Sequence, residues 1–191
     1  KRFTNKFGKP TFSHHKDALD KLNPDIVVIS TPTESHLSTF EDVMNHITPK
    51  MIILEKPLSY DVSESIKIID IGISRLIPVA VNYFREYEPT YRKILEKIKV
   101  GLVGFPIKLV IHYTKGINNN GSHFLKYILN FMGNFQSLDI ISHGRLWEGK
   151  DPEPDIHIQF EKGEAYFIAH SEENYSFYEM DIIGPEGKLR Y

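Results

Sequence analysis

The first half of the chain alternates short apolar runs with longer segments whose apolar residues recur at helical spacing. Residues 26–29 (IVVI) and 51–54 (MIIL) are uninterrupted apolar runs, which are typical of strands buried on both faces of a parallel sheet. Between them, residues 37–47 place apolar side chains three or four positions apart, as one face of a helix does. A strand, a helix and a second strand are therefore predicted over residues 25–57.

A second helix and a third strand extend this pattern. Residues 61–64 have the D-x-x-E form of a helix-capping box, and apolar residues at helical spacing follow over residues 66–73. Residues 78–81 then form a short apolar run. Because strand, helix, strand, helix, strand is the order of a doubly wound α/β sheet, we predict an incomplete Rossmann-like domain over residues 1–84.

The pattern changes after Phe84. Two helices and a long strand between them are predicted at residues 90–100, 122–132 and 107–113. From residue 156 onward apolar and polar side chains alternate, and glycine-containing turns interrupt the alternation, as in β-hairpins. Residues 85–191 are therefore predicted to form an α+β domain with an antiparallel sheet.

Composition excludes several classes of function. The formal net charge is -2 over 191 residues, and no run of basic residues is longer than two, so neither nucleic acid nor a membrane surface is an expected partner. The chain has no cysteine, which excludes disulfides and thiolate metal sites and is consistent with a reducing, cytoplasmic compartment. The histidines have no metal-ligand spacing, so no metal site is expected.

Lys56 ends the second predicted strand, at the edge of an open α/β sheet where ligands bind. Partial burial of a lysine there favours the neutral amine, which suits it to proton transfer or to holding a substrate oxygen. The alternative is an ordinary solvated lysine at a strand end.

His123 begins the predicted helix 122–132 and follows the polar loop 115–122 (KGINNNGS). A helix amino terminus disfavours the imidazolium, so the ring is expected to be neutral and able to accept a proton. The alternative is that Asn120 or Ser122 caps the helix and that the histidine has no role in catalysis.

Several segments together resemble the Gfo/Idh/MocA oxidoreductases. Ile29–Pro32 with His36, and Glu55–Leu58 (EKPL), are similar to the "TP…H" and "EKP" segments of that family. Asn82–Arg85 (NYFR), the loop 116–123 and the order of the two domains match as well. The resemblance extends over nearly the whole chain.

This resemblance implies a nucleotide-binding α/β domain followed by an α+β domain with an open antiparallel sheet. It implies NAD or NADP as cofactor and a sugar, an inositol or a related small molecule as substrate, including nucleotide-linked sugars. It also implies a homo-oligomer that forms through the open sheet.

The same likeness assigns roles to individual residues. Lys56 would contact the substrate hydroxyl and the nicotinamide end of the cofactor, and His123 would relay the hydroxyl proton as hydride leaves the adjacent carbon. The residues expected to bind the cofactor are Ser30, Thr31, Pro32, His36, Glu55, Lys56 and Asn82. The residues expected to bind the substrate are Arg85, Tyr113, Lys115, Asn119 and Asn120.

The sequence departs from the family pattern in three respects. The G-x-G-x-x-G turn that binds the pyrophosphate is absent, so the chain is expected to start within the first βαβ unit. Asn119 stands where many members have an aspartate, and an amide can bind a hydroxyl but cannot take its proton. The chain is also expected to end before the final strands of the second domain.

Two other functions are compatible with these residues. One is a non-catalytic sensor of the same fold that binds a dinucleotide or a sugar, which the asparagine at position 119 keeps open. The other is a glycosidase or lyase that recycles a bound cofactor within one turnover.

Overall fold

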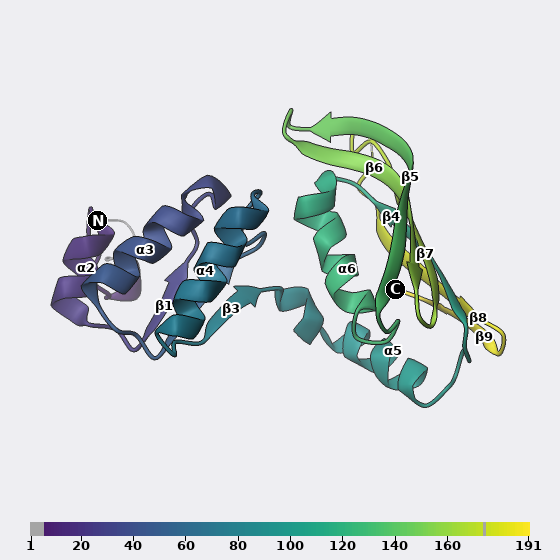
Figure 1. Cartoon of the computed structure of the whole chain (residues 1–191), viewed down its shortest axis with the longest axis horizontal. Coiled ribbons are helices and arrows are strands. Elements are labelled where there is room, and N and C mark those ends of the chain that lie inside the picture. Colours follow the sequence, from purple (N-terminus) through teal and green to yellow (C-terminus); the bar gives the residue numbers. More distant parts are fainter. Residues whose placement is uncertain (1–5, 174) are drawn as a thin grey trace. The chain divides into compact units, whose positions relative to one another are not determined.

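A computed structural model of the chain describes residues 6–173 and 175–191 (Figure 1). The chain divides into two units, Lys1–Asn82 and Tyr83–Tyr191. The sequence predicted this boundary after Phe84. In the structure Tyr83 and Phe84 belong to the second unit, and their rings contact His123 at centroid distances of 5.5 and 5.8 Å.

The first unit contains a three-stranded parallel sheet with helices in the connections between strands. The strands are β1 (Ile26–Ile29), β2 (Met51–Glu55) and β3 (Val79–Asn82), in the order β1-β2-β3. The helices are α2 (His15–Leu22), α3 (His36–His46) and α4 (Val62–Ser74), with a 3₁₀ turn at Thr33–Ser35. The predicted order of strands and helices is confirmed.

The core of the first unit lies between this sheet and its helices. Phe40 of α3, Ile52 and Leu54 of β2, and Ile68 of α4 are each 0% exposed and belong to one apolar cluster. Gly72 lets α4 approach β3 closely, because a Cβ at this position would lie 2.7 Å from Cγ2 of Val79. A larger residue at position 72 would therefore push the helix away from the sheet.

Two expectations for the first unit need correction. β1 is not buried on both faces, since Ile26 and Val28 are 55% and 56% exposed on this outer strand. The isoleucines that indicated α4 are not the residues that it buries: Ile66 and Ile73 are 53% and 68% exposed, whereas Ile68 is buried. An apolar pattern identifies the type of element but does not specify which neighbours cover it.

The second unit is a six-stranded sheet in the order β5-β6-β7-β4-β8-β9. Its strands are β4 (Ile107–Tyr113), β5 (Phe135–Trp147), β6 (Asp151–Phe160), β7 (Gly163–Ala169), β8 (Tyr178–Gly184) and β9 (Gly187–Arg190). Its helical segments are a 3₁₀ turn at Phe84–Tyr87, α5 (Pro89–Lys99), a π-helix at Gly116–Gly121 and α6 (Ser122–Ile128). The predicted fold class is confirmed with one correction. The sheet is mixed, because β4 and β7 pair in parallel, and alternation of side chains does not indicate strand direction.

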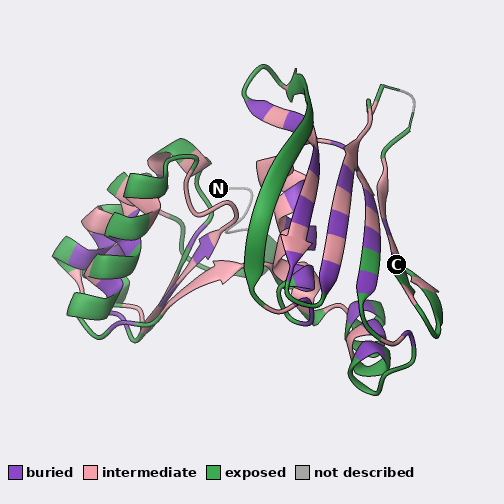
Figure 2. Cartoon of the chain, turned by 45° about the vertical axis from the view of Figure 1, so that its right-hand side comes forward, coloured by how far each residue is buried: buried purple, intermediate pink, exposed green. Residues whose placement is uncertain are grey.

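Buried and more accessible residues alternate along the inner strands of this sheet (Figure 2), because its two faces have different neighbours. One face packs against α5 and α6, and Ile107, Leu109 and Ile111 of β4 are 0% exposed there. The opposite face carries Lys108, whose Nζ lies 2.7 Å from Oε1 of Glu164 in the paired strand β7. The helices therefore cover the apolar face, and ion pairs occupy the opposite face.

Glu164 allows a test of how much the ion pair with Lys108 stabilises the fold. Hydrogen bonds from Lys108 and Tyr166 lower its pKa to about 2 from 4.5. A carboxylate with a lowered pKa stabilises the folded state above its unfolded pKa, and this contribution is lost as pH falls toward the folded pKa. After allowance for solvent screening, Glu164→Gln should lower the free energy of unfolding by about 1–2 kcal/mol at neutral pH.

The measurement is denaturant unfolding of both proteins at neutral pH, near pH 4 and near pH 2.5. We expect the difference between wild type and Glu164→Gln to shrink over this range. Glu96→Gln, on the exposed side of α5, is the control and should stay within about 0.5 kcal/mol of wild type. A loss in Glu164→Gln that is the same at every pH would contradict the assigned ion pair.

Candidate functional site

Polar side chains of the first unit gather at the carboxyl ends of its parallel strands. Residues 30–32 follow β1 and are exposed, Glu55 ends β2, and Asn82 ends β3. Glu55 and Asn82 face each other in register, and Nδ2 of Asn82 donates a hydrogen bond to Oε1 of Glu55 at 2.7 Å. Lys56 follows directly and is half-buried. Ligands bind at this edge in open α/β sheets.

His36 lies beneath the loops that form this edge. It is 0% exposed, with Nδ1 3.1 Å from the carbonyl oxygen of Leu58 and Nε2 3.0 Å from that of Thr31. A protonated ring nitrogen can donate to either carbonyl, so the ring connects the loop after β1 to the loop after β2. His36 was predicted to contact a cofactor. In the structure its ring is buried and connects the two loops, and its predicted contact with the cofactor stays a prediction.

His123 of the second unit is buried in an aromatic environment. It is 1% exposed, and the edges of Tyr83 and Phe84 pack against its ring. His123 is the second residue of α6, as predicted, but a π-helix over Gly116–Gly121 precedes it, so the ring does not lie at a free helix amino terminus. No side chain caps α6, and the Ser122 hydroxyl donates back to the carbonyl of Asn118 at 2.6 Å.

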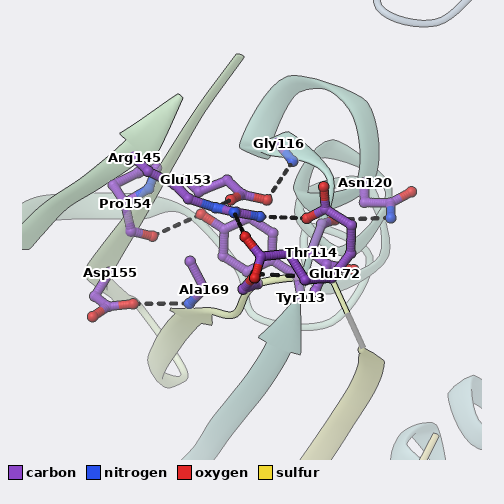
Figure 3. Close-up of polar contacts among 12 residues, drawn as sticks. Tyr113, Thr114, Gly116, Asn120, Arg145, Glu153, Pro154, Asp155, Ala169 and Glu172 are labelled. Atoms are coloured by element: carbon purple, nitrogen blue, oxygen red, sulfur yellow. Dashed lines mark hydrogen bonds and ion pairs between the residues drawn. The ribbon is translucent and has the colours of Figure 1, made fainter. Parts of the chain in front are cut away.

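The π-helix before His123 is bound by two buried carboxylates of β6, which we call the acidic clamp: Asp151 and Glu153, 0% and 1% exposed. Asp151 accepts hydrogen bonds from the main-chain N–H groups of Asn118 and Asn119, at 3.0 and 2.9 Å. Glu153 accepts from the N–H of Gly116 at 3.1 Å (Figure 3). The clamp therefore holds three main-chain groups of a single helical turn.

The two carboxylates of the clamp have different partners: Glu153 pairs with a cation, whereas Asp151 accepts hydrogen bonds. Arg145 of β5 binds Glu153, with Nε 2.6 Å from Oε2, and also pairs with Glu172 (Figure 3). Asp151 has hydrogen-bond donors instead. Burial raises the pKa of the Asp151 carboxyl above its ordinary value, whereas its hydrogen bonds from Asn118 and Asn119 lower it. The N–H donors of the π-helix thus help to keep Asp151 ionised.

The clamp was not predicted, because carboxylates in a strand are usually solvated. Asp151 and Glu153 stand two residues apart in β6, so both side chains face the same side. The predicted alternation began only at residue 156, and Ile156 and Ile158 are buried. Carrying it back along the strand would have selected Pro154 and Pro152 instead, because the buried positions shift by one residue between Glu153 and Ile156.

The remaining predicted residues of the second unit differ in their surroundings. The Arg85 guanidinium lies over the ring of Tyr178, with Cζ 3.9 Å from the ring centroid, as in a cation–π contact. Tyr113 is 0% exposed and its hydroxyl donates to the carbonyl of Pro154 at 2.7 Å, so its side chain packs in the core, and its predicted contact with substrate stays a prediction. Lys115 is half-buried in the left-handed region at φ 66°.

The asparagines of the π-helix lie beside the clamp. Nδ2 of Asn120 donates to the carbonyl of Thr114 at 2.9 Å, and Asn119 is half-buried. The structure thus groups Asn119, Asn120 and His123 in one continuous helical segment of the second unit. Lys56 is grouped with Glu55 and Asn82 in the first unit. A joint role of Lys56 and His123 stays a prediction.

Within residues 6–173 and 175–191, no group of three or more histidine or acidic side chains is arranged to hold a metal ion. In the same ranges no helix combines the length and the apolar character that crossing a membrane requires.

Comparison with known proteins finds a family match over the first unit. Residues 1–83 match the family model GFO_IDH_MocA, described as an oxidoreductase family with an NAD-binding Rossmann fold, in agreement with the predicted resemblance over these residues. The rhizopine catabolism protein MocA of Rhizobium meliloti is 27% identical over 97 residues, which cover 51% of this chain and 30% of that protein. Inositol 2-dehydrogenase 1 of Mycolicibacterium vanbaalenii is 32% identical over 100 residues, which cover 50% and 27%.

The fold extends over both units in solved structures. Myo-inositol dehydrogenase from Lactobacillus casei, in complex with NAD(H) and myo-inositol, aligns with a TM-score of 0.80 and 17% identity. The alignment covers 98% of this chain and 61% of that one. The chain therefore spans less than two thirds of the length of these relatives, and at this identity the structural match concerns the fold.

Gly116 provides a test of the clamp geometry. Its φ is +80°, and a Cβ at this position would lie 2.1 Å from Cγ of Asp151. Gly116→Ala should therefore lower the free energy of unfolding by about 2–4 kcal/mol, the range of a buried steric clash together with an unsatisfied carboxylate. Denaturant unfolding measures this loss.

The matched control for this test is Gly149→Ala. Gly149 has a similar φ of +72°, but a Cβ there would meet nothing within 4 Å. Only the backbone strain of a left-handed alanine, about 1–2 kcal/mol, is expected at this position. Equal losses in the two variants would mean that Gly116 does not pack against Asp151.

Proposed function

We propose that this chain, whose first unit belongs to the Gfo/Idh/MocA oxidoreductase family, acts in an NAD(P)-dependent oxidoreductase. The reaction is hydride transfer between a nicotinamide cofactor and a hydroxyl or keto group of a sugar or sugar-like substrate. The observation that carries this proposal is the polar edge of the first sheet, where Asn82 donates a hydrogen bond to Glu55, the residue directly before Lys56 in the sequence.

The residues of this edge fit the nicotinamide end of a dinucleotide. Residues 30–32 form an exposed loop along which a dinucleotide can lie, and the Glu55 carboxylate is an acceptor suited to ribose hydroxyls. The hydrogen bond from Asn82 orients that carboxylate before any ligand arrives. The cofactor, NAD or NADP, accepts or donates the hydride when bound, and the protein orients the partners.

Oxidation of an alcohol also releases the hydroxyl proton, which a protein group must accept. Asn119 cannot take it, because an amide is not a base at neutral pH. The proposal therefore assigns this proton to Lys56 and His123. A histidine ring can accept a proton, and His123 is held in place by the edges of Tyr83 and Phe84.

A polyol or sugar suits the amide side chains next to His123. Asn119 and Asn120 offer both donors and acceptors, which match the hydroxyl groups of such molecules. Two of the similar proteins are named as inositol dehydrogenases, which supports the same class of substrate for this chain. Arg85, held over Tyr178, is the cation that would bind an anionic group of a substituted sugar.

Lys56→Ala in the full-length protein tests the catalytic assignment. We expect turnover of a polyol panel with NAD or NADP to be lost. Dinucleotide affinity should stay within about tenfold, or about 1.4 kcal/mol, because the other residues of the edge still bind the cofactor. Steady-state formation of NADH and a fluorescence titration measure the two quantities separately.

Lys50→Ala is the control for this variant. Lys50 precedes the other end of β2 and pairs with Asp25 at 3.2 Å, far along the strand from the polar edge. It should retain wild-type turnover. Turnover of Lys56→Ala at the wild-type rate would remove Lys56 from the mechanism.

We further propose that the second unit forms a homo-oligomer through its open sheet. The strand β5 is exposed over nearly its whole length (Figure 2). Its exposed apolar side chains are Phe135, Leu138, Ile140, Ile141 and Leu146, at 46–62% exposure. A long apolar outer strand is a surface that proteins usually pair or cover.

Light scattering during size-exclusion chromatography tests this assembly in the full-length protein. Wild type should elute as an oligomer, and Ile141→Lys should shift it toward the monomer, because a buried ammonium group opposes association. Leu129→Lys, at a position 55% exposed outside β5, should leave the oligomer intact. A monomeric wild type would overturn the proposed assembly.

A further inference from the structure

We infer that Asp151 is a positioning residue for the proposed reaction. Its carboxylate fixes the main chain of the π-helix 116–121, and this helix sets the place of Asn119, Asn120 and His123. The catalytic part of this inference rests on the proposed function, whereas the structural part stands on the hydrogen bonds alone.

Asp151 binds the π-helix through both of its oxygens. Oδ1 accepts from the N–H of Asn118 at 3.0 Å and from its side-chain Nδ2 at 3.1 Å, and Oδ2 accepts from the N–H of Asn119 at 2.9 Å. The first N–H groups of any helix lack partners within the helix, so these donors need an external acceptor. Two oxygens on two consecutive N–H groups fix the rotation of the turn as well as its distance from β6.

Glu153 and Gly116 complete this arrangement. Glu153 binds the N–H of Gly116, which is the first residue of the π-helix, and Arg145 balances the charge of Glu153. Gly116 has no side chain and lies against Asp151, so the helix approaches the strand as closely as a main chain can. π-helical turns are uncommon and occur frequently at functional sites.

The opposite side of the turn is fixed separately. Asn120 donates to the carbonyl of Thr114, and Ser122 donates to the carbonyl of Asn118, so the segment is bound before and after the clamp. α6 continues from this turn without a break and places His123 against Tyr83 and Phe84. A rotation of the turn would therefore move the asparagines and the histidine together.

Asp151→Asn tests this role with almost no change in size. The amide keeps one acceptor oxygen but places an NH₂ group against a main-chain N–H, so one of the two N–H bonds must be lost. In the full-length protein we expect kcat to fall at least tenfold. The dissociation constant for the dinucleotide should stay within about twofold, since the polar edge of the first unit is unchanged.

The matched control is Asp155→Asn in the same strand. Oδ1 of Asp155 accepts from the main-chain N–H of Ala169 at 2.8 Å, so this variant also weakens a carboxylate–main-chain bond but does not touch the π-helix (Figure 3). Its kcat should stay within about twofold of wild type. Both variants are assayed well below their unfolding temperatures, so that general loss of stability does not lower the rate.

Amide hydrogen exchange separates the clamp from the reaction. Exchange at Asn118 and Asn119 should accelerate in Asp151→Asn and stay slow in Asp155→Asn. Unchanged exchange in Asp151→Asn would overturn the clamp, and an unchanged kcat would overturn its positioning role. A third outcome is possible: wild type transfers no hydride, yet exchange at Asn118 and Asn119 is faster in Asp151→Asn. That outcome would reject the proposed function but would still support the hydrogen bonds of the clamp.

Discussion

Parallel strands cannot be joined by a tight turn, and this constraint determines where the polar residues of the first unit meet. Each return of the chain must cross the sheet through a helix, so β1, β2 and β3 all end at the same edge. Residues 30–32, Glu55 and Asn82 come from three separate segments of the sequence and reach one edge for this reason. The hydrogen bond between Asn82 and Glu55 follows from their opposite positions in the register.

The second unit must hold an irregular helical turn, the π-helix that follows β4. The parallel pairing of β4 with β7 sends the chain from β4 through the π-helix and α6 before it returns to the sheet. The N–H groups of that turn would be buried without partners if β6 did not supply Asp151 and Glu153. Arg145 offsets one of the two buried charges. The clamp is therefore both a condition for folding and the support of the segment that carries His123.

The first unit was largely predictable from the sequence, whereas the site in the second unit was not. Uninterrupted apolar runs and a capping aspartate locate β1, β2 and α4, and Asp61 does accept from the N–H of Ser63 at 2.6 Å. The exposure of Ile26 and Ile73 could not be predicted, because burial depends on neighbours that a local pattern does not contain.

Long-range hydrogen bonds connect several predicted site residues to the fold. Tyr113 of the second unit and His36 of the first have side chains that are typical of binding sites, and both lie close to distant carbonyl groups, those of Pro154 and Leu58. Asp151, in contrast, was not predicted as a site residue. Its partners Asn118 and Asn119 lie more than 30 residues away in the sequence, so no local pattern connects them. Contacts of this kind are set by topology, which sequence periodicity does not encode.

Hydride transfer is the central claim, and isotopic transfer measures it most directly. The full-length protein is incubated with NAD or NADP and with myo-inositol or another polyol that carries deuterium on its hydroxyl-bearing carbons. We expect one deuterium per turnover on the reduced nicotinamide, which mass spectrometry of the isolated cofactor detects. Product that forms while the cofactor stays oxidised and free of deuterium would contradict this expectation.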